Sequence, residues 1–249
     1  VHLRMEAWGT WAAFLINLDS RPDRLRCVEG LLWPQTAWLA ERLQVVHALD
    51  GRGLAIERLG AEVVGVHHSE PVGDVRCRFM QLPGADLTFN LDWLHMTPGA
   101  IGCALSHYRI WEWLVQTGPA TGTEWAMILE DDLLWAAEGL RSRLDEVLQQ
   151  LPSDWHMCYI GWHGEAVVQL ALGRCTSRGA GVVLHRCEGA GPPLGTFAYL
   201  VSINGAKALL SEGAGLPLRH QLDVQLNRLF ATGKIRAYHC RDESCLFFS

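Results

Sequence analysis

The 249-residue chain contains no apolar run near the length of about 20 residues that a membrane-spanning helix needs. It also lacks an excess of bases, because 27 acidic residues outnumber 21 basic ones and give a formal net charge of −6. This balance argues against non-specific binding to nucleic acid and against a polybasic membrane anchor. The eight cysteines include no C-x-x-C pair, so the sequence does not favour a zinc ribbon or a zinc finger.

Three common motifs of nucleotide-binding proteins and hydrolases are absent as well. The sequence has no G-x-x-x-x-G-K-[ST] loop, no G-x-G-x-x-G fingerprint and no G-x-S-x-G elbow. P-loop nucleotidases, Rossmann-type oxidoreductases and serine hydrolases with a nucleophile elbow are therefore not favoured.

What the sequence does contain is an alternation of short apolar runs and amphipathic segments, in a composition with 49% hydrophobic and 19% charged residues. Strands are expected at 10–18, 44–48, 125–129, 155–160, 181–185, 196–201 and 234–238. Helices are expected at 22–33, 36–43, 97–118, 136–151, 202–210 and 219–231. This order predicts a single α/β domain over residues 1–249, with a mixed, mostly parallel sheet flanked by helices. The aperiodic segment 67–94 is expected to be an irregular, mobile loop that closes over a ligand.

The strongest local signal is the acidic run Glu130-Asp131-Asp132, which directly follows the apolar strand expected at 125–129. Three adjacent carboxylates repel one another unless a cation compensates their charge. The carboxyl end of a strand is the usual ligand site of an α/β sheet, and oxygen ligands suit Mg²⁺ or Mn²⁺ together with substrate phosphates. The alternative is a solvated turn that caps the following helix.

Four further residues carry candidate chemistry on weaker grounds. Ser106 and His107, in the helix expected at 97–118, either pack in the core or face an anion near the helix start. Asp223 lies among apolar neighbours in the last expected helix, where an acid is either a paired structural residue or a base with an adjusted pKa. His239 is either an ordinary surface histidine or a ligand. The residues alone leave these alternatives open.

Taken in order, several segments resemble glycosyltransferase family 25, which includes bacterial lipooligosaccharide β-galactosyltransferases and eukaryotic procollagen galactosyltransferases. The resemblance rests on FLINLDSRPDRL at 14–25, ALDG at 48–51, TPGAIGCALSH at 97–107, LEDD at 129–132, and GTFAYL, GAKALL and LD at 195–200, 205–210 and 222–223. Together these blocks span about residues 12–238, and their common order makes the resemblance specific.

The resemblance implies a GT-A-like fold, with a nucleotide-sugar-binding half at about 10–135 and an acceptor-binding half at about 136–240. It implies metal-dependent transfer of a hexose, galactose or glucose, from a UDP-sugar donor to a hydroxyl of a glycan or glycoprotein acceptor, with inversion at the anomeric carbon. The cofactor implied is Mn²⁺, or Mg²⁺, bridging the acidic run and the donor diphosphate.

The resemblance also suggests roles for individual residues. Asp223 is the candidate catalytic base, and Asp132, Glu130 and His239 are the candidate metal ligands. The candidate donor-binding residues follow the first two strands or belong to the Ser-His pair and the acidic run: Asn17, Asp19, Arg21, Arg24, Asp50, Ser106, His107, Glu130 and Asp131.

Two alternatives from other classes remain open. Ala100 stands where the family usually carries a glutamate, so the chain could be a non-catalytic GT-A-like domain that binds a sugar nucleotide or a glycan. The acidic run could also serve a metal-dependent phosphoesterase, which would need further His and Asp ligands at strand ends.

Overall fold

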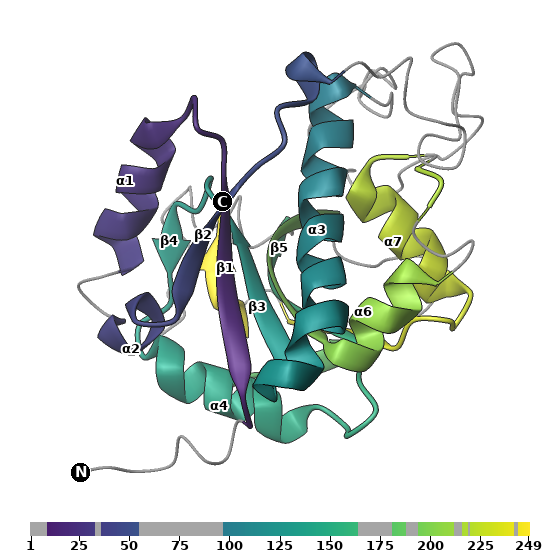
Figure 1. The fold of residues 1–249 in the computed structure, drawn as a ribbon. Helices are drawn as coiled ribbons and strands as arrows, with labels where there is room; N and C mark the ends of the chain where they lie inside the picture. The colour runs from purple at the N-terminus through teal and green to yellow at the C-terminus, as the bar shows by residue number, and fades with distance from the viewer. Residues whose placement is uncertain are drawn as a thin grey trace, which may run out of the picture.

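The computed structural model is built around one sheet with helices on both sides (Figure 1). It describes residues 9–32, 36–54, 97–163, 181–187, 194–211, 216–218, 220–241 and 244–249. The segment 67–94, for which the sequence predicts a mobile loop, lies outside the described residues. Within the described ranges, no helix combines the length and the apolar character needed to cross a membrane.

The main sheet, in the described part of the chain, has seven strands in the order β2-β1-β3-β7-β5-β8-β6. Their bounds are β1 Trp11–Asn17, β2 Leu43–His47, β3 Trp125–Glu130, β5 Met157–His163, β6 Leu184–Arg186, β7 Leu194–Ser202 and β8 Ala237–Cys240. β1, β2, β3, β5 and β8 run in one direction, whereas β7 and β6 are antiparallel to their neighbours. The expected α/β class with a mixed, mostly parallel sheet is confirmed, and the arrangement is consistent with a GT-A-like fold.

Two layers of helices cover the sheet, one on each face (Figure 1). On one side lie α1 (Pro22–Leu32), α2 (Ala37–Ala40) and α4 (Leu140–Gln150), and on the other lie α3 (Pro98–Thr121), α6 (Ile203–Leu210) and α7 (Leu222–Ala231). Each layer packs its apolar side chains against the facing sheet and forms a separate hydrophobic core. Because both faces are covered, β1 is buried along its whole length, which explains why it is apolar rather than alternating.

The sequence explains where the longest helix, α3, begins. Thr97 is its N-cap and accepts a hydrogen bond (3.1 Å) from a backbone nitrogen one turn later, and Pro98 stands in the first turn, where a missing N–H is tolerated. The expected end at Gly118 is wrong, because the helix continues to Thr121. The left-handed residue that ends the helix is Gly122, with a φ of 72°.

The helix expected at 136–151 begins later than predicted. Trp135–Ala136 form a short strand, β4, which pairs with β9 (Phe247–Phe248) at the far end of the chain. This long-range pairing overrides the local helical pattern, so α4 starts only after Gly139. The acidic run at 130–132 is therefore not the cap of α4. The helix expected at 36–43 likewise shrinks to α2, because β2 already begins at Leu43.

The strand directions bring distant segments to one edge of the sheet. In the parallel registers, Asn17 pairs with His47 and Ile16 with Glu130, so β1, β2 and β3 end side by side. β5 and β8 also end at this edge, and the antiparallel β7 begins there. Residues that follow β1, β2 and β3 therefore meet those at the end of β5 and the start of β7.

Candidate active site

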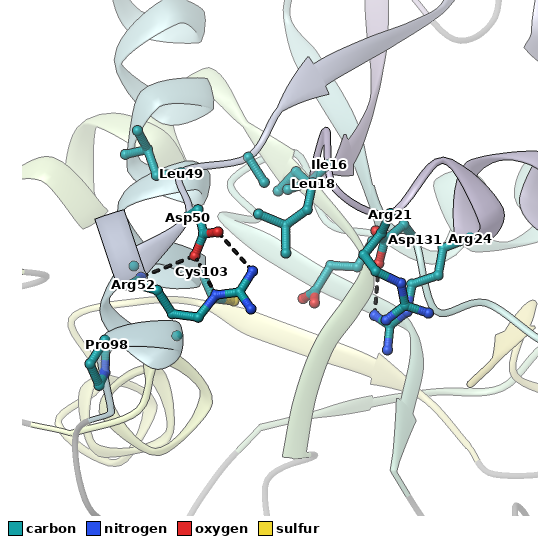
Figure 2. A pocket seen from close by; sticks show the side chains of 14 residues that line it. Ile16, Leu18, Arg21, Arg24, Leu49, Asp50, Arg52, Pro98, Cys103 and Asp131 are labelled. Atoms are coloured by element: carbon teal, nitrogen blue, oxygen red, sulfur yellow. Dashed lines mark hydrogen bonds and ion pairs between the residues drawn. The ribbon is translucent and has the colours of Figure 1, made fainter. Parts of the chain in front are cut away.

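A cavity of about 480 Å³ opens at this edge, between the ends of β1, β2 and β3 and the first turns of α3. Among the candidate donor-binding residues, Arg21, Arg24, Asp50, Glu130 and Asp131 line it. Figure 2 shows Asp50 on one side of the cavity and Arg21, Arg24 and Asp131 on the other. The described edge of the sheet thus places carboxylates and guanidinium groups around a space large enough for a small ligand.

Asp131 joins the acidic run to the turn between β1 and α1. Arg24 Nη1 lies 3.0 Å from Asp131 Oδ1, and Asn17 Nδ2 donates to Asp131 Oδ2 over 2.8 Å. Asn17 Nδ2 also reaches the backbone oxygen of Arg21 (3.1 Å). Both carboxylate oxygens of Asp131 are engaged, so hydrogen bonds link four of the candidate donor-binding residues: Asn17, Arg21, Arg24 and Asp131.

Two hydrogen bonds hold the carboxylate of Glu130 in place. Thr196 Oγ1 donates to Glu130 Oε1 over 2.6 Å, and His107 Nε2 lies 3.2 Å from the same oxygen. Burial alone would raise the pKa of the Glu130 carboxyl, but the hydrogen bond and charge of His107 and the hydrogen bond of Thr196 outweigh it and hold this pKa below its usual value. Glu130 is therefore kept ionised.

Asp132 is in the opposite situation. Its Oδ1 is buried and has no hydrogen-bond partner in the described part of the chain. Burial, and next the negative charge of Glu130, raise the pKa of Asp132 to about 6. An unpartnered carboxylate oxygen beside a second carboxylate is an arrangement that a divalent cation satisfies, so the side chains present fit a hard cation such as Mg²⁺ or Mn²⁺.

Ser106 and His107 lie behind the cavity wall rather than in it, and both are fully buried. Ser106 Oγ donates to the backbone oxygen of Gly102 (2.7 Å) and accepts from the backbone nitrogen of Leu49 (2.9 Å). His107 Nδ1 lies 2.9 Å from the hydroxyl of Tyr199. The Ser-His pair therefore fastens α3 to the loop after β2 and to the back of Glu130.

Asp223 lies at the start of α7, next to the start of β7. Its Oδ2 accepts a hydrogen bond from the backbone nitrogen of Gly195 (3.1 Å), and its Oδ1 accepts one from Val224 (2.7 Å). Arg228, on the same helix, makes no ion pair with it, and Arg219 lies outside the described residues. Among the described cations, none lies within ion-pair distance of Asp223.

Three other candidate residues contact residues outside the acidic run. Asp19 pairs with His47 (2.5 Å) through side chains that are largely exposed. Asp50 pairs with Arg52 (2.8 Å) at the cavity rim. His239 packs its ring against Trp162 and His185.

His239 also lies on a strand well away from the acidic run. β8 is three strands from β3, which at roughly 4.8 Å per strand separates His239 from Glu130 by about 14 Å. The structure therefore does not bring His239 next to Glu130 and Asp132.

Sequence reasoning missed Cys103, His163, Thr196 and Tyr199. Cys103 lines the cavity, and its thiol lies within 4.8 Å of ligand atoms of His107 and Glu130. These three residues could hold a metal only if His107 gave up a hydrogen bond, since both its ring nitrogens are engaged. Thr196 and Tyr199 stand in the matched block GTFAYL and could have been found there, whereas His163 carries no signal beyond its place at a strand end.

Comparisons with known proteins identify the family of this chain. The model of "Glycosyltransferase family 25 (LPS biosynthesis protein)" matches residues 11–173. A relative from Bos taurus, "Probable inactive glycosyltransferase 25 family member 3", is 30% identical over 89% of this chain and 31% of its own length. "Procollagen galactosyltransferase 1" of Danio rerio is 27% identical over 85% of this chain and 30% of its own length. "Procollagen galactosyltransferase 2" of Homo sapiens is 25% identical over 92% and 32%.

The chain thus spans about one third of the length of these relatives. The family match covers the cavity and the acidic run, and the matches to the relatives extend over most of the chain. This chain belongs to glycosyltransferase family 25.

Proposed function

We propose that the chain is a metal-dependent hexosyltransferase that moves galactose or glucose from a UDP-sugar to a hydroxyl of a glycan or glycoprotein acceptor. The observation that carries the proposal is the buried Oδ1 of Asp132, which has no hydrogen-bond partner among the described residues, close to Glu130, which lines the cavity. Mn²⁺, or Mg²⁺, would be held by these two carboxylates. When bound, the cation would supply the positive charge that stabilises the leaving diphosphate.

The cavity provides the donor site in this proposal. Its lining residues all fall between Ile16 and Asp131, which supports a nucleotide-sugar-binding half at about 10–135. Arg24 would direct its remaining N–H donors at the diphosphate, since one of them is used by Asp131. Asp50, across the cavity, would accept from the ribose or the uracil. Galactose and a glycoprotein acceptor are supported by the names of the two procollagen galactosyltransferases.

The acceptor half, at about 136–240, would contribute the base. Asp223 is fixed by two backbone N–H groups and has no cation partner among the described residues, so its carboxylate can still accept a hydrogen bond from an incoming hydroxyl. Taking that proton as the hydroxyl attacks the anomeric carbon, on the face opposite the leaving UDP, would invert the configuration.

The direct test is UDP release from UDP-galactose and UDP-glucose with Mn²⁺, with and without collagen-derived peptide or glycan acceptors. We expect one of the two donors to give acceptor-stimulated UDP release that EDTA abolishes. Full activity in EDTA would contradict the metal dependence, and absence of release with every donor and acceptor would contradict catalysis.

A non-catalytic sugar-nucleotide-binding domain is the second candidate, because several relatives of similar identity are named inactive members of the family. In that case UDP-galactose would raise the melting temperature of the protein without being consumed. Membership of family 25 leaves the phosphoesterase alternative without support.

A further inference from the structure

A chain of hydrogen bonds between buried side chains leads from the core to Glu130. Trp111 Nε1 donates to the Tyr199 hydroxyl (3.0 Å), which lies 2.9 Å from His107 Nδ1. His107 Nε2 continues to Glu130 Oε1 (3.2 Å), where Thr196 Oγ1 also donates (2.6 Å). Trp111, Tyr199 and His107 are fully buried, so water does not compete for these bonds.

The chemistry of the groups fixes the direction of the two outer bonds of this chain. An indole N–H only donates, so the Tyr199 oxygen accepts from Trp111. An ionised carboxylate only accepts, so His107 carries a hydrogen on Nε2 that points at Glu130. Nδ1 of His107 is hydrogen-bonded to the Tyr199 hydroxyl. Both ring nitrogens are therefore engaged, which fixes the orientation of the imidazole.

Both bonds to Glu130 fall on the same oxygen. Oε1 accepts from His107 and from Thr196, whereas no described residue donates to Oε2. The Glu130 side chain is 21% exposed and lines the cavity, so a carboxylate clamped at Oε1 keeps its second oxygen available there.

We propose that His107 and Thr196 are positioning residues that hold Oε1 of Glu130 and leave Oε2 directed at the divalent cation, and that Tyr199 and Trp111 hold the His107 ring in the orientation this needs. The inference rests on the proposed function, because Glu130 is a cation ligand only there. It gives the Ser-His motif a task different from nucleotide contact. Outer residues of this kind commonly set the affinity of a metal site.

The structure offers a matched pair of variants that separates this role from packing. Tyr199→Phe and Tyr108→Phe each remove one hydroxyl from a buried ring that lies near Trp111. The Tyr199 hydroxyl belongs to the chain of hydrogen bonds, whereas the Tyr108 hydroxyl has no hydrogen-bond partner among the described residues. Thr196→Val removes the donor to Glu130 at nearly constant volume, and Thr196→Ser restores it.

The measurement is Mn²⁺ binding to the whole chain without donor, followed by electron paramagnetic resonance of free Mn²⁺, with melting temperatures as the check on folding. We expect Thr196→Val to weaken Mn²⁺ binding about 10–100-fold and Tyr199→Phe at the lower end of this range. Thr196→Ser and Tyr108→Phe should bind Mn²⁺ like the wild type. If Tyr199→Phe does not fold, the two Thr196 variants decide the question alone.

Two results overturn the inference while the proposed function stands. One is wild-type Mn²⁺ affinity in both Thr196→Val and Tyr199→Phe. The other is a loss of Mn²⁺ affinity in Tyr108→Phe as large as that in Tyr199→Phe. A wild-type chain that binds no Mn²⁺ overturns the metal-dependent function, and the inference with it.

Discussion

Arg24 Nη1 lies 3.0 Å from Asp131 Oδ1 and thereby joins the first helix to the acidic run more than one hundred residues later. The carboxylate side chain is 10% exposed, and its only other partner among the described residues is Asn17. The arginine side chain is 40% exposed, so water replaces its lost bonds more easily than those of the acid. The pair therefore matters mainly because it prevents Asp131 from being a partly buried, uncompensated charge.

We expect Arg24→Met to lower the free energy of unfolding by about 1–2 kcal/mol, less than the loss at a fully buried pair, because solvent partly screens this one. Arg21→Met is the matched control, since Arg21 pairs with Asp23 on the open surface and its loss should leave the midpoint of urea unfolding unchanged. An equal shift of the midpoint in both variants would contradict this account of Asp131.

Gly102, in the matched motif 97–107, allows α3 to lie close to the loop after β2. A Cβ at this position would stand 2.3 Å from the backbone oxygen of Leu49 and 2.6 Å from the backbone nitrogen of Gly51. Gly102→Ala should therefore push α3 away from the loop after β2 and lower the free energy of unfolding by about 1–3 kcal/mol. It should also weaken UDP binding, because this loop carries Asp50.

Gly30→Ala in α1 is the control for the Gly102 prediction. No atom of the residues that the structure describes lies within 4 Å of a Cβ at Gly30, so only the helix propensity changes. This variant should be more stable than the wild type by about 0.5–1 kcal/mol. Thermal melts of the two variants test the pair, and a neutral Gly102→Ala would show that the loop can yield.

Much of the fold was predictable because the buried strands are apolar throughout and the helix starts carry recognisable caps, such as Thr97 and Ser202. The elements that were misjudged depend on partners far along the chain. A helix is expected from residue 136, but Trp135–Ala136 pair as a strand with Phe247–Phe248. No local pattern predicts that contact. The end of α3 was misplaced because both Gly118 and Gly122 could end a helix, and only the backbone angle decides.

The candidate site was predictable to a similar depth. The acidic run was found because three carboxylates after an apolar strand are rare without a ligand. The residues that support it were not found, because only the pairing of the strands and the packing of α3 bring His107 and Thr196 to Glu130. Burial cannot be read from the Ser-His pair itself, so packing in the core and contact with an anion both stayed open from the sequence.

Asp132 predicts a specific pH dependence of stability in the metal-free protein. Burial, and next the charge of Glu130, raise its pKa from 3.8 to about 6, so the folded state binds this proton more tightly than the unfolded state. The contribution of Asp132 to stability is therefore fully present below pH 4 and is lost as the pH rises through 6. The loss should amount to about 1–3 kcal/mol.

Asp132→Asn isolates this contribution, because other titrating groups cancel in the difference between variant and wild type. We expect the variant to gain stability relative to the wild type on going from pH 4 to pH 7, measured by urea unfolding in EDTA. Mn²⁺ should stabilise the wild type at pH 7 and leave the variant unaffected, and transfer activity should be lost. A difference that is constant with pH would refute the raised pKa.

The role of Asp223 gives the sharpest test of catalysis. Its carboxylate is anchored by the backbone nitrogens of Gly195 and Val224, and no described cation pairs with it. Asp223→Asn keeps the size of the side chain and the acceptor for Gly195 but cannot take a proton. If Asp223 is the base, the variant should bind UDP-sugar like the wild type and lose transfer by about 10²–10⁴-fold, the usual share of general base catalysis.

Glu112→Gln, on the exposed side of α3, is the control for the loss of one negative charge and should keep full activity. Donor binding measured by calorimetry and turnover measured by UDP release separate the possible roles of Asp223. Normal turnover in Asp223→Asn would remove it from the mechanism. Loss of donor binding would instead assign Asp223 to the donor or cation site, and the base would then be sought elsewhere. Because His163 packs against Gly195 beside this carboxylate, it would be the next residue to test.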